Sequence, residues 1–150
     1  MEENLIISKF NQIEKIYKNN ITKNILIKRI RATFSRTMLC LYNLIDGTIT
    51  GLERNDNKGL TNPLLWEFGH VIFFWQEMTC KYLNIDTKKL PKHIYDSALI
   101  NRENRWKAKL WNIKKLNNIY VTTLRTIIEY IKNNKLNNIN SYLIQLSQLL

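Results

Sequence analysis

One domain is what 150 residues allow, and 45% apolar with 23% charged residues is ordinary for a globular protein. The net charge of +11 comes from lysines and arginines spread along the whole chain, which argues against a nucleic-acid site and favours a compositional origin. No stretch reaches the roughly 18 consecutive apolar residues of a membrane span. The acidic start at Met1 lacks the basic region of a signal peptide, so we expect a cytoplasmic protein.

Five segments place apolar residues three and four positions apart, as amphipathic helices do. They are residues 3–19, 25–46, 63–83, 113–133 and 138–150. Gly47 is expected to end the second helix, and Asn112 to cap the fourth. At the third helix we expect Asn62 as the cap and Pro63 at the first helical position. The last segment has no stop signal, so we expect the chain to end within a helix.

Residues 84–111 form a long connection, and a crossover that links two parallel helices needs such a length. The sequence therefore predicts an all-α fold: a four-helix bundle over residues 25–150 with one long crossover, preceded by an extra N-terminal helix over residues 1–24. Cys40 and Cys80 lie in apolar helical patterns, so we expect free thiols in the core.

The main candidate for a site is His70, in the most apolar helical segment of the chain. Gly69 beside it costs a helix roughly 1 kcal/mol relative to Ala, which calls for a packing or site reason. Glu67 shares the helical face, but a carboxylate di-metal site needs a second Glu-x-x-His, and the other histidine, His93, lies in a polar connection. Two interpretations remain open: a satisfied core histidine, or one ligand of an incomplete metal site facing the bundle interior.

Arg102 and Arg105 form the second candidate, because two guanidinium groups three residues apart on a helical turn can point the same way. Such a pair suits a carboxylate or a phosphate. The alternative is two exposed arginines near Glu103, with Trp106 as a core anchor.

The most specific pattern is N-P-L-L-W-E-F-G-H over residues 62–70, followed by F-F-W-Q-E over residues 73–77. It resembles the DinB-like domain at the start of ergothioneine and ovothiol sulfoxide synthases. Residues 30–37 resemble that family's first bundle helix, and residues 95–106 resemble the D-S and R-x-x-R segment of its crossover. The resemblance covers about residues 25–150, with Asn62 where the family has Ser and Glu67 where it has Asp or His.

The resemblance implies that His70 is one of three iron ligands, and that Arg102 and Arg105 hold carboxylates of the thiol substrate. In the family the other two ligands come from a His-x-x-x-His-x-Glu motif on the fourth bundle helix, and a domain like the formylglycine-generating enzyme completes the active site. This chain ends before both.

We therefore expect a remnant or split fragment of a non-haem iron sulfoxide synthase, an enzyme of iron-dependent C–S bond formation. Alone it would be non-catalytic and bind no cofactor; Fe(II) would bind once a partner chain supplied the missing helix and domain. Self-association is a further expectation, since the truncated last helix would leave apolar surface uncovered. The alternative is a free-standing helical protein-interaction module without metal chemistry.

Overall fold

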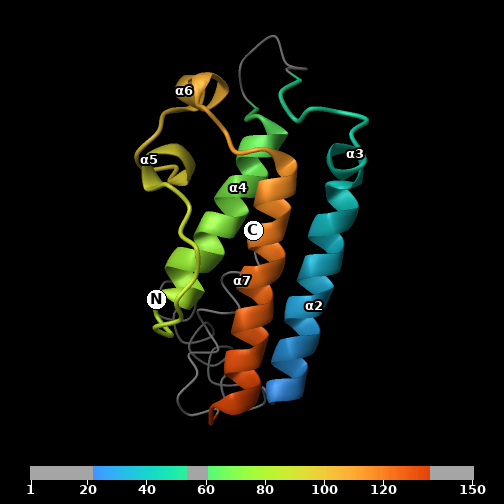
Figure 1. Ribbon diagram of the computed structural model, residues 1–150, viewed down its shortest axis with the longest axis vertical. Helices are drawn as coiled ribbons and strands as arrows, with labels where there is room; N and C mark the ends of the chain where they lie inside the picture. The colour runs from blue at the N-terminus through green and yellow to red at the C-terminus, as the bar shows by residue number, and fades with distance from the viewer. Residues whose placement is uncertain (1–21, 54–60, 136–150) are drawn as a thin grey trace, which may run out of the picture.

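Three long helices, α2 (Lys23–Cys40), α4 (Leu64–Trp75) and α7 (Ile113–Asn133), dominate the computed structural model, which describes residues 22–53 and 61–135 (Figure 1). Shorter elements connect them: α3 (Tyr42–Ile45), the π-helical turn η1 (Gln76–Cys80), α5 (Lys92–Tyr95) and α6 (Arg102–Lys107). No strand occurs in these two ranges, so the predicted all-α class is confirmed there. Within them, no helix is both long and apolar enough to cross a membrane. The helices expected over residues 3–19 and 138–150 lie outside the described residues.

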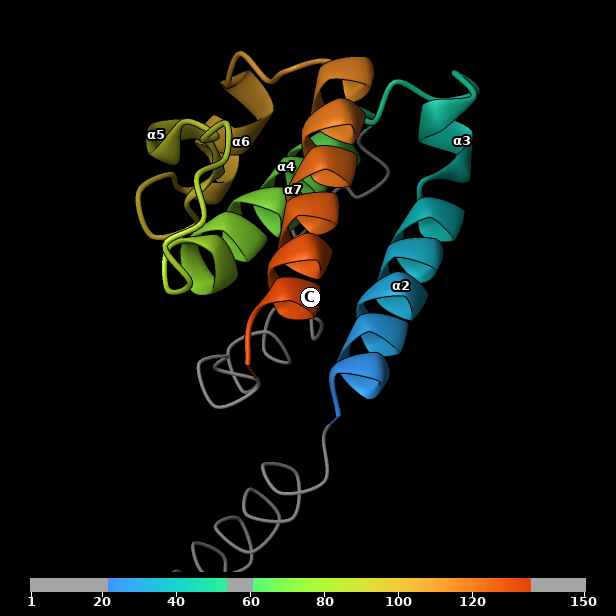
Figure 2. The ribbon, with the colours of Figure 1, turned by 60° about the horizontal axis from the view of Figure 1, so that its bottom comes forward.

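The directions of the long helices follow from the connections between them. In Figure 1, α2 runs upward, whereas α4 and α7 both run downward, with the crossover of residues 84–111 returning the chain between them. Helix α7 packs against both α2 and α4, and Figure 2 shows the same arrangement from below. The prediction that the long crossover links two parallel helices is therefore confirmed.

The core lies where α7 meets its two neighbours. Fully buried apolar side chains come from each long helix, and burying each of them stabilises the fold by about 1.5–3 kcal/mol. They include Leu26 and Ile30 of α2, Trp66, Phe68, Ile72 and Trp75 of α4, and Leu116, Tyr120, Ile127 and Ile131 of α7. The stripe expected on residues 113–133 is confirmed, and the side chain of Asn112 accepts a hydrogen bond from the Lys115 amide at 2.9 Å, which caps that helix as predicted.

The helix expected over residues 25–46 is interrupted. Its N-terminus is capped by Thr22, and α2 ends at Cys40, because Leu41 leaves the helical conformation with φ −98° and ψ 8°. Leu41 is buried, whereas Cys40 is exposed, so the expectation that Cys40 is a core residue is wrong. Gly47, with φ +84°, follows α3 as predicted.

Helix α4 begins one residue later than expected and is capped differently. Pro63, with ψ 131°, stands just outside the helix, and the Leu65 amide donates to the Gly51 carbonyl at 3.1 Å. The connecting loop thus satisfies one of the free amides at this helix end. Asn62 was expected to cap the helix, but its side chain hydrogen-bonds Glu67 and Arg105 instead.

After Trp75 the helix widens into the π-helical turn, in which the Lys81 amide donates to the Gln76 carbonyl at 2.9 Å. The single helix expected up to residue 83 therefore changes its hydrogen bonding near its end. Cys80 lies in this turn and is buried, as predicted, and burial raises the pKa of its thiol to about 11. A thiol with such a pKa stays protonated at neutral pH and is therefore a poor nucleophile.

Candidate functional site

The candidate site lies between α4 and the crossover, and Trp66 is at its centre. Its indole is 1% exposed, and its Nε1 donates a hydrogen bond to the Ile94 carbonyl at 2.6 Å. Four residues later on the same helical face, the ring of His70 stacks on it, with 4.8 Å between ring centroids and 15° between the planes. The spacing within one helix thus brings the histidine onto the indole.

His70 is half-buried and turned toward the crossover. Its Nδ1 lies 2.7 Å from the Tyr95 carbonyl oxygen, which can only accept, so Nδ1 is the nitrogen that carries the proton of the neutral ring. Nε2 then presents its lone pair, and within the described residues it has no hydrogen-bond partner. Metal-ligating histidines are oriented in this way by a carbonyl on the other nitrogen. His70 was expected to point into the bundle interior. This is found only in part, because His70 is half-buried, as is Phe74 on the same helical face.

Gly69 explains how the crossover comes so close to α4. A Cβ at this position would overlap the ring of Tyr95, which is 0% exposed. The Tyr95 hydroxyl accepts a hydrogen bond from the Trp111 amide at 2.8 Å, and burial raises its pKa. Gly69 therefore has a packing reason, one of the two kinds of reason expected from the sequence. Tyr95, whose ring occupies the space beside Gly69, also orients His70 through its carbonyl oxygen.

Arg105 closes the other end of this cluster. Its guanidinium lies 4.1 Å from the centroid of the Trp66 ring and donates to Asn62 Oδ1 at 3.0 Å. Further bonds go to the carbonyls of Ile100 at 3.2 and 3.3 Å and of Ser97 at 3.3 Å. Burial lowers the pKa of Arg105, and the charge of Glu67 opposes that change. Most of its donors are thus used in holding the crossover.

The other predicted residues are more exposed. Arg102 is exposed at the first position of α6, near enough to Arg105 for their like charges to lower the pKa of Arg105. Of the expected arginine pair, Arg102 is therefore the one available to a ligand. His93 is exposed in α5, as predicted. Trp106, expected as a core anchor, is half-buried and donates to the Thr61 carbonyl at 3.3 Å, because α6 lies at the edge of the bundle.

Sequence reasoning missed Gln76, a polar residue that is 1% exposed. Its Oε1 accepts from the Leu90 amide at 3.0 Å, and its Nε2 donates to the Lys88 carbonyl at 2.8 Å. One carboxamide therefore satisfies both a donor and an acceptor of the irregular chain. A glutamine in an apolar run was the only signal that could have pointed to it.

The side chains around His70 decide whether a metal ion fits this site. Across residues 22–53 and 61–135, no three His, Cys, Asp or Glu side chains come together as a group that could hold a metal ion. Glu67, on the face of His70, is hydrogen-bonded by Asn62. His70 fits the role of a single imidazole ligand, and closing a metal site around it requires donors from elsewhere.

No protein-family model matches the chain, and a search of curated proteins finds no significant match. The resemblance to the sulfoxide synthases therefore remains an expectation from the sequence motifs of residues 30–37, 62–77 and 95–106.

Proposed function

We propose that this chain is the helical, DinB-like module of a non-haem iron sulfoxide synthase, and that it acts only together with a second chain. The observation that carries the proposal is the orientation of His70. Its Nδ1 is held by the Tyr95 carbonyl, and its Nε2 lone pair is available to a metal. In this proposal the three long helices α2, α4 and α7 belong to a four-helix bundle, and a partner supplies the remaining metal ligands.

Each residue around His70 has a role that this proposal uses. Stacking on Trp66 and the bond to Tyr95 fix the imidazole ring, so little entropy is lost when a metal binds. Arg102, exposed on α6, would bind a carboxylate of the thiol substrate, while Arg105 holds the crossover in place. Bound Fe(II) would supply the chemistry of C–S bond formation.

The test is completion of the site in solution. The full chain is mixed with a synthetic helical peptide that carries His-x-x-x-His-x-Glu, with and without Fe(II) under anaerobic conditions, and the Tm is measured. We expect peptide and metal together to raise the Tm, since a ligand that binds only the folded state stabilises it. His70→Asn should abolish the rise, whereas the matched change His93→Asn, at an exposed position, should keep it. An equal rise in the His70→Asn variant, or none in the unaltered chain, would refute the proposal.

A second candidate is a helical protein-interaction module without metal chemistry. It is favoured by the use that the structure makes of the same side chains: Trp66, His70 and Arg105 all bond the crossover backbone. A purely structural role explains those contacts without any ligand. The completion experiment separates the two candidates, because an interaction module would be indifferent to Fe(II) in every variant.

A further inference from the structure

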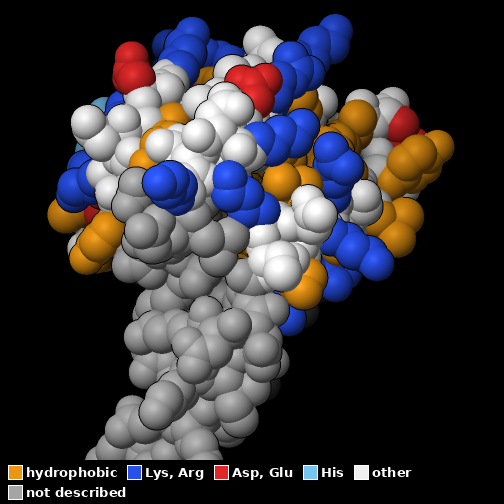
Figure 3. Space-filling view, turned by 90° about the horizontal axis from the view of Figure 1, so that it is seen from below, with side chains coloured by type: hydrophobic (Ala, Val, Ile, Leu, Met, Phe, Trp, Pro, Cys, Tyr) orange, Lys and Arg blue, Asp and Glu red, His pale blue; other side chains and the backbone are white. Residues whose placement is uncertain are grey.

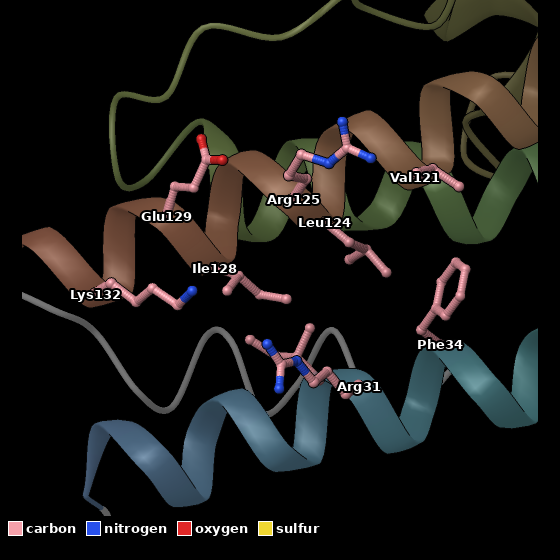
Figure 4. Close-up of a pocket in the computed structure, with 9 residues that line it drawn as sticks. Arg31, Phe34, Val121, Leu124, Arg125, Ile128, Glu129 and Lys132 are labelled. Atoms are coloured by element: carbon pink, nitrogen blue, oxygen red, sulfur yellow. The ribbon is translucent and has the colours of Figure 1, made fainter.

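A groove runs between α2 and α7 (Figure 4). None of the residues that line it belongs to the cluster around His70. Its volume is about 270 Å³. The lining residues from α2 are Ile30, Arg31 and Phe34, and those from α7 are Val121, Leu124, Arg125, Ile128, Glu129 and Lys132.

The floor and walls of the groove are apolar. Ile30 and Leu124 are 0% and 3% exposed and close the bottom, whereas Phe34, Val121 and Ile128 are half-buried and form the sides. From Val121 to Lys132 the wall is about 16 Å long, at the helical rise of 1.5 Å per residue. Side chains at positions i, i+4 and i+7 of a helix span about 10 Å, so the groove has room for such a row.

The rim of the groove is positively charged. Arg31, Arg125 and Lys132 stand against one carboxylate, Glu129, and within the described chain no acidic side chain forms an ion pair with Arg31 or Arg125. Helix α2 adds to this charge, because its 18 residues include no Asp or Glu. Figure 3 views the lower end of the molecule in Figure 1, where α2 begins and α7 ends, and shows many Lys and Arg side chains and few acidic ones there.

We propose that the α2–α7 groove binds the apolar face of an acidic amphipathic helix from another protein. Apolar side chains of the partner would fill the floor, and flanking carboxylates would pair with Arg31, Arg125 and Lys132. A second copy of this chain does not suit the groove, because a symmetric contact would bring the same cations face to face. The inference is independent of His70 and of the proposed function.

The test measures binding of a labelled synthetic peptide to the full chain by fluorescence anisotropy. The peptide is helical, with Leu at positions i, i+4 and i+7 and Glu on both flanks. We expect it to bind about tenfold tighter than a peptide with Lys in place of Glu, and raised salt should weaken it. A third peptide, with Ala in place of Leu, should not bind. It tests the apolar contacts without any substitution in the protein.

Variants of the chain locate the site. Arg31→Glu with Arg125→Glu should weaken binding about tenfold or more. The matched control, Lys107→Glu with Lys114→Glu, makes the same change in net charge at exposed positions outside the groove and should weaken binding far less. Equal weakening by both pairs would overturn the proposal in favour of attraction to overall charge. Dimerisation of the chain through this groove, with loss of peptide binding, would also overturn it.

Discussion

The two sides of the bundle are held together in different ways. On the crossover side, α4 and η1 bind irregular chain through aromatic rings and through hydrogen bonds from Trp66, His70 and Gln76 to backbone groups. Between α2 and α7 the contacts are mainly apolar, with hydrogen bonds from the Tyr120 hydroxyl to Thr37 at 3.3 Å and from Lys23 Nζ to the Lys132 carbonyl at 3.0 Å. Regular helices satisfy their own backbone groups, whereas a crossover needs side chains to do so.

The motif of residues 62–70 has a structural explanation in this difference. Its polar and aromatic members are those that an irregular segment requires, so their presence is explained structurally before any ligand is invoked. The α2–α7 side needs no such members, and among the described residues no acidic side chain pairs with Arg31 or Arg125 on the rim of the groove.

The largest effect on the free energy of unfolding is expected for a substitution in the apolar contact between α2 and α7. Ile30→Ala removes a fully buried side chain and should lower the free energy of unfolding by about 2–5 kcal/mol. Ile128→Ala, at the half-buried wall of the groove, should cost roughly 1 kcal/mol, since less area is removed from contact. Urea unfolding measures both. Similar costs for the two variants would contradict the division of the groove into floor and wall.

On the crossover side, Gly69→Ala should destabilise the fold by about 1–3 kcal/mol, because the added methyl group overlaps the Tyr95 ring. This opposes the usual gain of about 1 kcal/mol for Gly to Ala within a helix. Gly47→Ala gives the comparison without overlap: no atom lies within 4 Å of the added group, and its φ of +84° makes any loss there a matter of backbone strain alone. Thermal or urea unfolding that shows Gly69→Ala to be stabilising would break the packing argument.

The two sides also predict unequal roles for two arginines. Arg105→Ala removes several hydrogen bonds and the contact with Trp66, and should cost roughly 1–2 kcal/mol. Arg125→Ala, on the rim of the groove, should change stability by about 0.5 kcal/mol or less. Chemical denaturation of the two variants side by side gives the comparison. Equal losses would show that the groove cations stabilise the fold itself.

Helix 113–133 was predicted with the bounds that the structure shows, because Asn112, a strong apolar stripe and Asn134 all mark it. The break at Leu41 carries no Gly or Pro, so periodicity alone extended that helix. Helices α5 and α6 have four and six residues, too few for a period to be seen. His70 and Gly69 could be singled out from the sequence because they lie in an apolar helix. Tyr95 and Gln76 could not, because they hydrogen-bond backbone groups of residues far along the chain, which no local pattern reveals.

The smallest expected effect concerns the turn before α4. The Glu53 carboxylate accepts from the Thr50 amide at 2.6 Å, the Thr50 hydroxyl at 2.8 Å and the Gly51 amide at 2.8 Å, and these bonds lower its pKa to about 2. The lowered pKa means that the turn is stabilised above pH about 4.5 and loses this contribution as the pH falls toward 2. An NMR titration of the Glu53 carboxyl group checks it; an ordinary pKa would show that the turn is open. Because Glu53 is exposed, its effect on global unfolding should be far below that of Arg105.

The π-helical turn at residues 76–80 has a consequence for insertions and deletions. A π turn closes a hydrogen bond over five residues where an α turn closes it over four, so it accommodates one residue more. Removing Met78 would therefore let the turn revert to α geometry while the residues on either side keep their faces, so Cys80 and Leu83 would stay in the core. A deletion inside α4 would instead rotate every following residue by about 100° around the helix axis and turn Trp75 away from the core. At the π-helical turn the chain can lose one residue, whereas the α-helix before it cannot.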